Sequence, residues 1–182
     1  MDYFALFGMP PAFQVDRNQL DTVYREKQQL FHPDRFALRS IQERRYSLEQ
    51  VTQLNEAWRT LRDPLQRGEY LLRLLEGGDL SPSPAGNEEN MAGDPEFLLE
   101  VMEMREALAM ITPSHATASQ QLAALRQDVE QRIAAEISAV NDALTAAWAE
   151  SSASSAREHA KRHIKRLRYH KRFVEELDRL EE

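Results

Sequence analysis

Residues 31–36 of this 182-residue chain read Phe31-His32-Pro33-Asp34-Arg35-Phe36. Pro33 ends the helical pattern before it, because proline has no backbone N–H and disfavours helical geometry in the preceding residue. That pattern starts at Asp16, which we expect to be an N-cap, with Gln19 completing a capping box. Its apolar side chains share one helical face: Leu20, Val23, Tyr24 and Phe31. Residues 31–36 are therefore predicted to form a loop between two helices.

The other periodic segments of the chain are helical as well. A short apolar piece at residues 3–7 ends at Gly8. After the loop, apolar residues recur at intervals of three and four positions at Leu48, Val51, Leu54, Trp58 and Leu61. Asp63-Pro64 ends this helix and begins the next. Because no run of β-branched residues alternates with polar ones, we expect an all-α protein.

The distribution of charge indicates two domains. Residues 1–76 carry 11 basic and 11 acidic side chains, whereas residues 77–182 carry 12 and 19. Residues 77–93 begin with a stretch rich in glycine, proline and serine that has no hydrophobic period, so we interpret them as a linker. The expected domains are therefore residues 1–76 and residues 94–182.

Residues 94–182 are predicted to fold as a three-helix bundle. The first helix begins at Asp94-Pro95, an N-cap followed by proline, and runs to Ile111. A long helix ends with Trp148 on its apolar stripe, and both tryptophans of the chain are expected in the core. A third amphipathic helix follows, and the short connections make the three helices antiparallel neighbours.

The tripeptide His32-Pro33-Asp34 is the feature from which a function can be argued. By itself it is also explained as a helix-breaking turn whose aspartate caps the next helix. As a docking element, Pro33 would restrict the backbone and reduce the entropy lost on binding. Asp34 would offer a carboxylate to a guanidinium group, and such a pair is strong where water is excluded.

The surroundings of the tripeptide resemble a J-domain, the module through which DnaJ-type co-chaperones stimulate a DnaK-type ATPase. The wider pattern is similar to the HscB family, the J-domain co-chaperones of bacterial iron–sulfur cluster assembly. The resemblance rests on Met1-Asp2-Tyr3-Phe4 with Leu6-Phe7-Gly8, His32-Pro33-Asp34-Arg35-Phe36, Leu54-Asn55-Glu56-Ala57-Trp58, Glu69-Tyr70-Leu71-Leu72 and Phe97-Leu98-Leu99-Glu100. It implies a J-domain at residues 1–76 and a separate C-terminal helical domain, and it covers nearly the whole chain.

The resemblance also implies a first partner, an HscA-like chaperone ATPase of the DnaK type. The contacts that it implies are His32, Pro33, Asp34 and Arg35 in the loop, with Arg25 and Lys27 on the preceding helix. Because the partner hydrolyses ATP, this chain needs no catalytic residue of its own. We therefore expect neither an enzyme nor a cofactor.

The helix that starts at Asp94 has two apolar faces. Taking about 100° per residue, one group lies within about 40° of Phe97. This group comprises Val101, Met104, Leu108 and Ile111. A second group spreads from about 100° to 220°, and it comprises Leu98, Leu99, Met102 and Met110, with Glu103 and Glu106 beside them. Two interpretations remain open: a middle helix that buries both faces, or an exposed apolar patch for a partner.

The family resemblance favours the exposed patch and implies its partner. In the HscB family this surface binds IscU, the scaffold protein on which iron–sulfur clusters are assembled. Carried over to this sequence, the contacts are Leu98, Leu99, Met102, Glu103 and Glu106, with Tyr169 as an aromatic neighbour from the last helix. Methionines make such a surface adaptable, and the glutamates would orient a basic partner.

Composition argues against several other classes of function. The chain has no cysteine, which excludes disulfides, thiolate zinc sites and cysteine nucleophiles. No apolar segment is long enough to cross a bilayer and no secretory signal is recognisable, so we expect a cytoplasmic protein without a membrane partner. Neither a paired-carboxylate cleft nor a glycine-rich phosphate loop nor a catalytic triad can be argued from the residues.

Rival interpretations remain beside the co-chaperone. Residues 157–172 hold eight basic side chains and one acidic, as nucleic-acid-binding helices do. The acidic domain and the spread of charge around the helix favour a solvated face instead, so we expect no nucleic-acid partner. His159 and His163 are spaced i, i+4 but lack a third ligand, so no metal is expected. A generic J-protein for unfolded clients differs only in having no single defined partner.

Overall fold

The structure, a computed structural model, describes residues 2–78, 93–111, 117–149 and 154–181. Within these ranges every regular element is a helix, which confirms the expected all-α class. Two compact units are present, Met1–Ser81 with Leu144–Ala153 and Pro82–Ala143 with Ser154–Glu182, and each is described by itself. Most of the predicted linker at residues 77–93 lies outside the described residues, so the expected domain bounds stay predictions.

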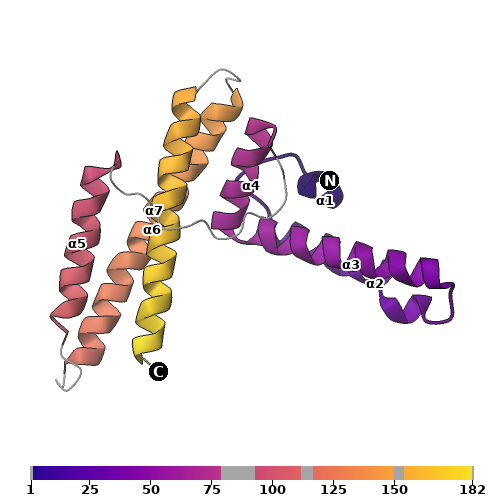
Figure 1. The fold of residues 1–182 in the computed structure, drawn as a ribbon, viewed down its shortest axis with the longest axis horizontal. Helices are drawn as coiled ribbons and strands as arrows, with labels where there is room; N and C mark the ends of the chain where they lie inside the picture. The colour runs from indigo at the N-terminus through magenta and orange to yellow at the C-terminus, as the bar shows by residue number, and fades with distance from the viewer. Residues whose placement is uncertain (1, 79–92, 112–116, 150–153, 182) are drawn as a thin grey trace. The chain divides into compact units, whose positions relative to one another are not determined.

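The first unit is built around a hairpin of two helices (Figure 1). Its elements are α1 (Tyr3–Phe7), α2 (Arg17–Leu30), the short 3-10 helix η1 (Pro33–Phe36), α3 (Ile41–Arg62) and α4 (Pro64–Glu76). α2 packs along α3, and α1 and α4 also contact α3. The turn of the hairpin contains η1, so the tripeptide lies in the loop that the sequence predicts.

Caps explain where the hairpin helices begin. The Asp16 carboxylate accepts hydrogen bonds from the backbone N–H groups of Asn18 and Gln19 at 2.9 and 3.2 Å, which confirms the predicted N-cap of α2. α3 begins with a full capping box between Ser40 and Glu43, which the sequence analysis does not identify. Each cap satisfies backbone donors that a helix start leaves unpaired.

Side chains of α2 and α3 hold the hairpin together. Leu20 and Leu54 are buried between the helices. Trp58 of α3 donates from its ring N–H to the Asp21 carboxylate of α2 at 2.8 Å. The same ring stacks on Tyr24 with the ring centroids 4.7 Å apart. Because these contacts fix one helix against the other, the loop that joins them is carried on a stiff support.

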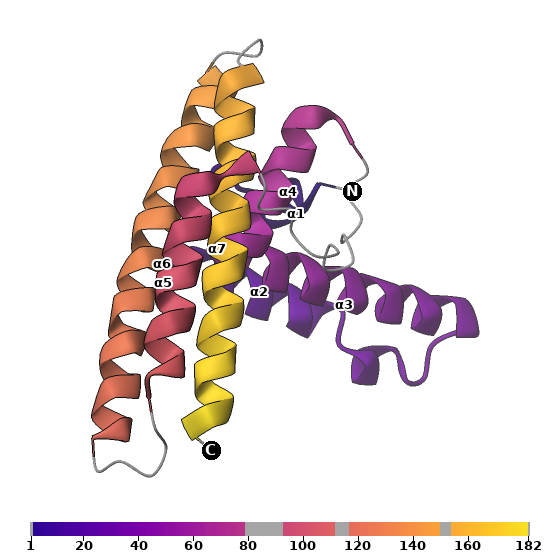
Figure 2. The same ribbon diagram turned by 60° about the vertical axis from the view of Figure 1, so that its left-hand side comes forward.

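The second unit packs three helices side by side (Figures 1 and 2). They are α5 (Pro95–Ala109), α6 (Ala118–Ala149) and α7 (Ser154–Glu181), and the part of α6 from Leu144 onward is grouped with the first unit. The core of the bundle comprises Phe97, Val101 and Met104 from α5, Val129 from α6, and Phe173 and Leu177 from α7. One apolar face of α5 therefore packs against the other two helices.

Two expectations about these helices are wrong. α5 ends at Ala109, with Met110 as its C-cap, and does not continue to Ile111. Trp148 is 40% exposed, although its position on an apolar stripe predicted a core side chain. A stripe identifies the face of a helix, but near the end of the helix fewer neighbours are available to cover a large side chain.

Candidate docking surfaces

The tripeptide loop is held in shape by its own residues. His32 caps η1, because its Nδ1 atom accepts a hydrogen bond from the backbone N–H of Asp34 at 3.3 Å. Arg35 donates from its guanidinium group to the backbone carbonyl of Gln29 at 3.3 Å. Pro33 fixes one backbone dihedral angle between these two contacts. The loop is therefore an ordered turn whose conformation does not depend on the Asp34 side chain.

The Asp34 carboxylate points to solvent, with its side chain 91% exposed. The His32 ring lies beside it, with 3.5 Å between its Nδ1 atom and Oδ2. While Nδ1 accepts the backbone N–H it carries no proton, so the two side chains do not form an ion pair in that state. The carboxylate is thus available to a positive group from outside the chain.

A buried hydroxyl group fixes the base of the loop. Ser47 of α3 has no exposed surface, and its Oγ atom donates to the backbone carbonyl of Phe31 at 2.6 Å. The Phe31 ring packs edge-on against Tyr46, with 6.4 Å between the ring centroids. These contacts tie the residue before the tripeptide to α3. A single serine among polar neighbours gives no sequence signal of this role.

The basic residues that the resemblance implies lie on α2 and in the loop. Arg25 is exposed and Lys27 is half-buried near the end of α2. Arg35 is exposed in η1 beside Asp34. Their proposed contact with a chaperone stays a prediction.

The second apolar face of α5 is exposed. Leu98, Leu99 and Met102 are 42%, 63% and 60% exposed, whereas Phe97 and Met104 on the opposite face are each 2% exposed. Glu103 and Glu106 are exposed beside them. A helix that buries both faces is thereby excluded, and the α5 patch, defined as these three apolar residues with the two glutamates, is free to meet a partner.

Tyr169 of α7 lies beside α5. Its ring meets Phe97 edge-on at 5.6 Å between centroids, and its hydroxyl group accepts from Arg105 Nε at 3.0 Å. Arg105 also donates to both carboxylate oxygens of Glu176 at 2.7 Å. The predicted aromatic neighbour is therefore half-buried against α5 and engaged by an arginine of that helix.

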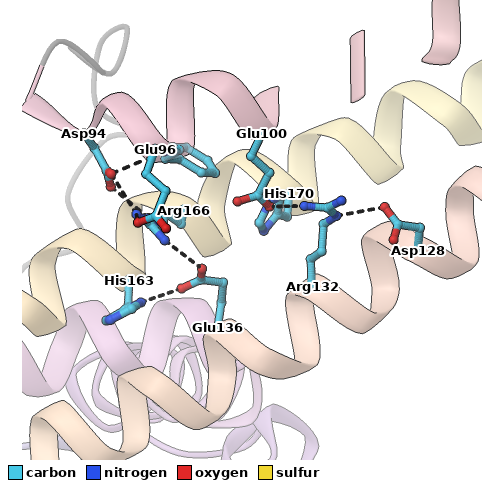
Figure 3. Close-up of polar contacts among 10 residues, drawn as sticks. Asp94, Glu96, Glu100, Asp128, Arg132, Glu136, His163, Arg166 and His170 are labelled. Atoms are coloured by element: carbon cyan, nitrogen blue, oxygen red, sulfur yellow. Dashed lines mark hydrogen bonds and ion pairs between the residues drawn. The ribbon is translucent and has the colours of Figure 1, made fainter. Parts of the chain in front are cut away.

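Charged side chains join the start of α5 to the other helices (Figure 3). Arg166 of α7 donates to both oxygens of Asp94 at 2.8 and 2.7 Å, and its guanidinium lies over the Phe97 ring. The hydrogen bond from Arg166 lowers the pKa of Asp94. Behind it, Glu136 of α6 lies 3.8 Å from Arg166 and 2.7 Å from His163 Nδ1. Asp94 thus serves both as N-cap and as anchor.

A second ionic cluster holds the middle of α5, as Figure 3 also shows. Glu100 accepts from Arg132 of α6 at 2.8 Å and meets His170 Nε2 of α7 at 3.0 Å. Arg132 in turn donates to Asp128 at 2.8 Å. His170 is fully buried and its Nδ1 atom has no hydrogen-bond partner, so the neutral ring with its proton on Nε2 fits the site best. Burial lowers the pKa of His170 accordingly.

The depressed pKa of His170 makes stability depend on pH. Below the ordinary histidine pKa of 6.5, the unfolded chain binds a proton at His170 that the folded chain does not bind. The contribution of this group to the free energy of unfolding is therefore complete above pH 6.5 and decreases as the pH is lowered below it. Between about pH 7.5 and pH 5.5 we expect the free energy of unfolding to fall through this group. Urea titrations at both pH values measure the change.

The matched variants for this measurement are His170→Gln and His159→Gln. A glutamine amide at position 170 still donates to Glu100 but does not titrate, so the fall in stability should shrink. His159 is exposed, and its replacement should leave the fall as it is. An undiminished pH dependence in His170→Gln would show that another group is responsible.

The basic segment at residues 157–172 is partly engaged within the protein. Arg166 has only 14% of its side chain exposed, and His163 contacts Glu136. Arg162, Lys165 and Arg172 remain exposed. Sequence reasoning missed these inward contacts, because their acidic partners lie up to 72 residues away. Among the described residues, no helix has the length and apolar character that crossing a bilayer requires.

Known proteins resemble the chain over both units. Residues 93–178 match the family described as the HSCB C-terminal oligomerisation domain. The Co-chaperone protein HscB homolog of Cupriavidus taiwanensis is 43% identical over 144 residues, which cover 78% of each chain. Chaperone HscB from Vibrio cholerae has a TM-score of 0.79 at 34% identity, covering 100% of this chain and 98% of its own. Human co-chaperone protein HscB has a TM-score of 0.80 at 30% identity, with 100% and 82% covered.

Proposed function

The chain belongs to the HscB family of co-chaperones, and we propose that it brings an iron–sulfur scaffold protein of the IscU type to a DnaK-type chaperone of the HscA type. It stimulates the ATPase of that chaperone in the cytoplasm. The catalytic residues belong to the chaperone, and this chain contributes two docking surfaces.

The chaperone docks on the loop between α2 and α3. Asp34 pairs with an arginine of the chaperone, and the exclusion of water on docking strengthens the pair. His32 and Pro33 hold the loop in its conformation before binding, which lowers the entropic cost of association. Arg25, Lys27 and Arg35 add positive charge around the carboxylate and steer an acidic surface toward the loop.

The scaffold protein docks on the α5 patch. Leu98, Leu99 and Met102 lose their exposed apolar area in the complex, which supplies most of the affinity. Glu103 and Glu106 orient a basic surface of the scaffold, and Tyr169 lies at the edge of the contact. The observation that carries the proposal is this patch, because a helix that exposes large apolar side chains beside carboxylates is built for a partner.

Because both surfaces belong to one chain, a bound scaffold is brought to the chaperone that the loop has bound. A scaffold bound to α5 is held near a chaperone bound to the loop, at an effective concentration far above that of the free scaffold. A generic J-protein would lack this fixed cargo.

Self-association is a second candidate function of the α5 patch. The family that matches residues 93–178 is described as an oligomerisation domain, and two copies of an exposed apolar helix face can cover one another. Sedimentation velocity of the full chain distinguishes the candidates. A monomer that forms a complex only when scaffold is added supports cargo binding, whereas a dimer that excludes the scaffold supports self-association.

The proposed function is tested by single-turnover hydrolysis of ATP bound to a purified HscA-type chaperone. We expect the full chain to raise the rate saturably, and the chain with an IscU-type scaffold to raise it further than either protein alone. Omission of the chaperone gives the background rate. A rate that the chain does not change at any concentration would reject the chaperone partner.

A further inference from the structure

α5 can bury either of two apolar faces. Phe97 and Met104 belong to the face that is buried, and Leu98 and Met102 belong to the face that is exposed. Both faces offer large apolar side chains, so the hydrophobic effect favours burial of either face, although Glu103 and Glu106 beside the exposed group oppose its burial. The exposed group is centred about 150° from Phe97, so a rotation of the helix by about 150° about its own axis would exchange the two faces. The charged side chains of α5 are therefore the groups that distinguish the two orientations.

The charged contacts of α5 lie on both sides of its buried face. Taking about 100° per residue from Phe97, Arg105 falls at about 80°, on the boundary between the buried face and the α5 patch. Glu100 falls at about 300°, on the opposite boundary. Asp94 adds a contact at the first turn, where it is paired with Arg166. Together they hold the helix at its start, its middle and its later part.

We propose that Asp94, Glu100 and Arg105 are positioning residues, which select the apolar face of α5 that is buried and thereby display the α5 patch. Each of the three pairs with a partner on α6 or α7: Arg166 for Asp94, Arg132 and His170 for Glu100, and Glu176 with Tyr169 for Arg105. A rotation of about 150° would break these pairs, because it carries Glu100 to the exposed side and Arg105 to the opposite boundary of the buried face.

The free-energy cost of rotating α5 comes from the polar groups on α7 that would lose their partners. His170 is fully buried and Arg166 has 14% of its side chain exposed. If α5 rotated, the buried Nε2–H group of His170 would lose its acceptor Glu100, and Arg166 would lose its two hydrogen bonds to Asp94 and keep only the more distant Glu136, which is costly. Contacts between apolar side chains depend less on exact geometry than these hydrogen-bonded pairs do. The ion pairs therefore fix the rotation, while the apolar core supplies the cohesion.

The orientation of α5 can be measured without any partner, because the chain has no cysteine of its own. A single cysteine is introduced as Met102→Cys on the patch or as Met104→Cys in the core. The probe is a maleimide, and its reaction rate reports how often each position is exposed. In the otherwise unchanged chain, we expect the position 102 thiol to react at least about 100-fold faster than the position 104 thiol.

The positioning residues are then neutralised together by Asp94→Asn, Glu100→Gln and Arg105→Gln, in each single-cysteine chain. Asparagine replaces aspartate at position 94 because asparagine also caps a helix. We expect the ratio of the two rates to fall at least about 100-fold, to about one, with the reaction at 102 becoming about twofold slower and that at 104 about 50-fold faster. This opposite movement is the signature of rotation, since simple loosening accelerates both.

Two controls accompany the triple variant. Glu158→Gln removes an exposed ion pair within α7 and should leave the ratio unchanged. Arg105→Glu should lower the ratio, and the exchanged pair Arg105→Glu with Glu176→Arg should restore it. A ratio unaffected by the triple variant, or two rates that rise together, would overturn the proposal.

The consequence for cargo rests on the proposed function and is read separately. In the cysteine-free chain, the triple variant should weaken binding of an IscU-type scaffold, in calorimetry, in inverse proportion to the fraction of chains that still display the α5 patch, which is about twofold when the rate ratio has fallen to about one. If the unchanged chain does not bind the scaffold, the proposed function fails while the labelling result still decides the orientation. If it binds and the triple variant binds equally well although α5 rotates, the patch is not the cargo site.

Discussion

Asp34→Asn is expected to abolish stimulation of the chaperone ATPase. The substitution keeps the shape of the side chain and removes its charge. The loop should not change, because its bond to His32 uses the backbone N–H of residue 34 and Arg35 bonds to the backbone of Gln29. A pair between a carboxylate and a guanidinium group that water no longer reaches contributes about 1.5–3 kcal/mol. Its loss corresponds to a weakening of roughly tenfold to 100-fold, with the chemical specificity of the contact removed as well.

The measurement is single-turnover hydrolysis over a range of co-chaperone concentrations. Glu49→Gln is the matched control, because it removes one negative charge from a side chain of the same unit that is 63% exposed. It should stimulate like the unchanged chain, and both variants should bind the scaffold normally. Full stimulation by Asp34→Asn would mean that the loop is only a structural turn.

The combined substitution of Leu98, Leu99 and Met102 by alanine is expected to weaken scaffold binding by at least about 100-fold. Each truncation removes apolar area that the complex would bury, worth about 1 kcal/mol or more per side chain. About 3 kcal/mol in total gives that factor. The fold should persist, because the three side chains are exposed and alanine has the highest helix propensity.

Isothermal calorimetry with the purified scaffold measures this effect, and thermal unfolding checks the fold. Leu180→Ala is the matched control, since Leu180 is an exposed leucine of the same bundle on α7. Its affinity should equal that of the unchanged chain, and so should ATPase stimulation by the triple variant in the absence of scaffold. If the triple variant binds the scaffold with the affinity of the unchanged chain, the α5 patch is not the scaffold-binding surface.

Local interactions made much of the fold predictable from the sequence. Asp16, Asp63 and Asp94 each cap a helix where expected, because a cap depends on residues two or three positions away. The two faces of α5 follow from the helical repeat alone. The identity of the buried face does not follow from the helical repeat, since it depends on the other two helices of the bundle.

Contacts between distant segments were not predictable in the same way. Arg166 and His170 belong to a segment whose composition indicated a solvated or nucleic-acid-binding helix, yet their partners Asp94 and Glu100 lie 72 and 70 residues away. No local pattern pairs them. The exposure of Trp148 was mispredicted for a related reason, because its cover depends on neighbours that periodicity does not specify.

The buried Ser47 hydroxyl has an evolutionary consequence. Under the proposed function it would not meet the chaperone, yet it holds the carbonyl of Phe31 and so the conformation of the loop that would. Selection for ATPase stimulation would then act on a position that no map of the molecular surface displays. Substitution at position 47 would be restricted to small residues that can donate a hydrogen bond, and a loop transplanted onto another hairpin would have to bring this buried residue along.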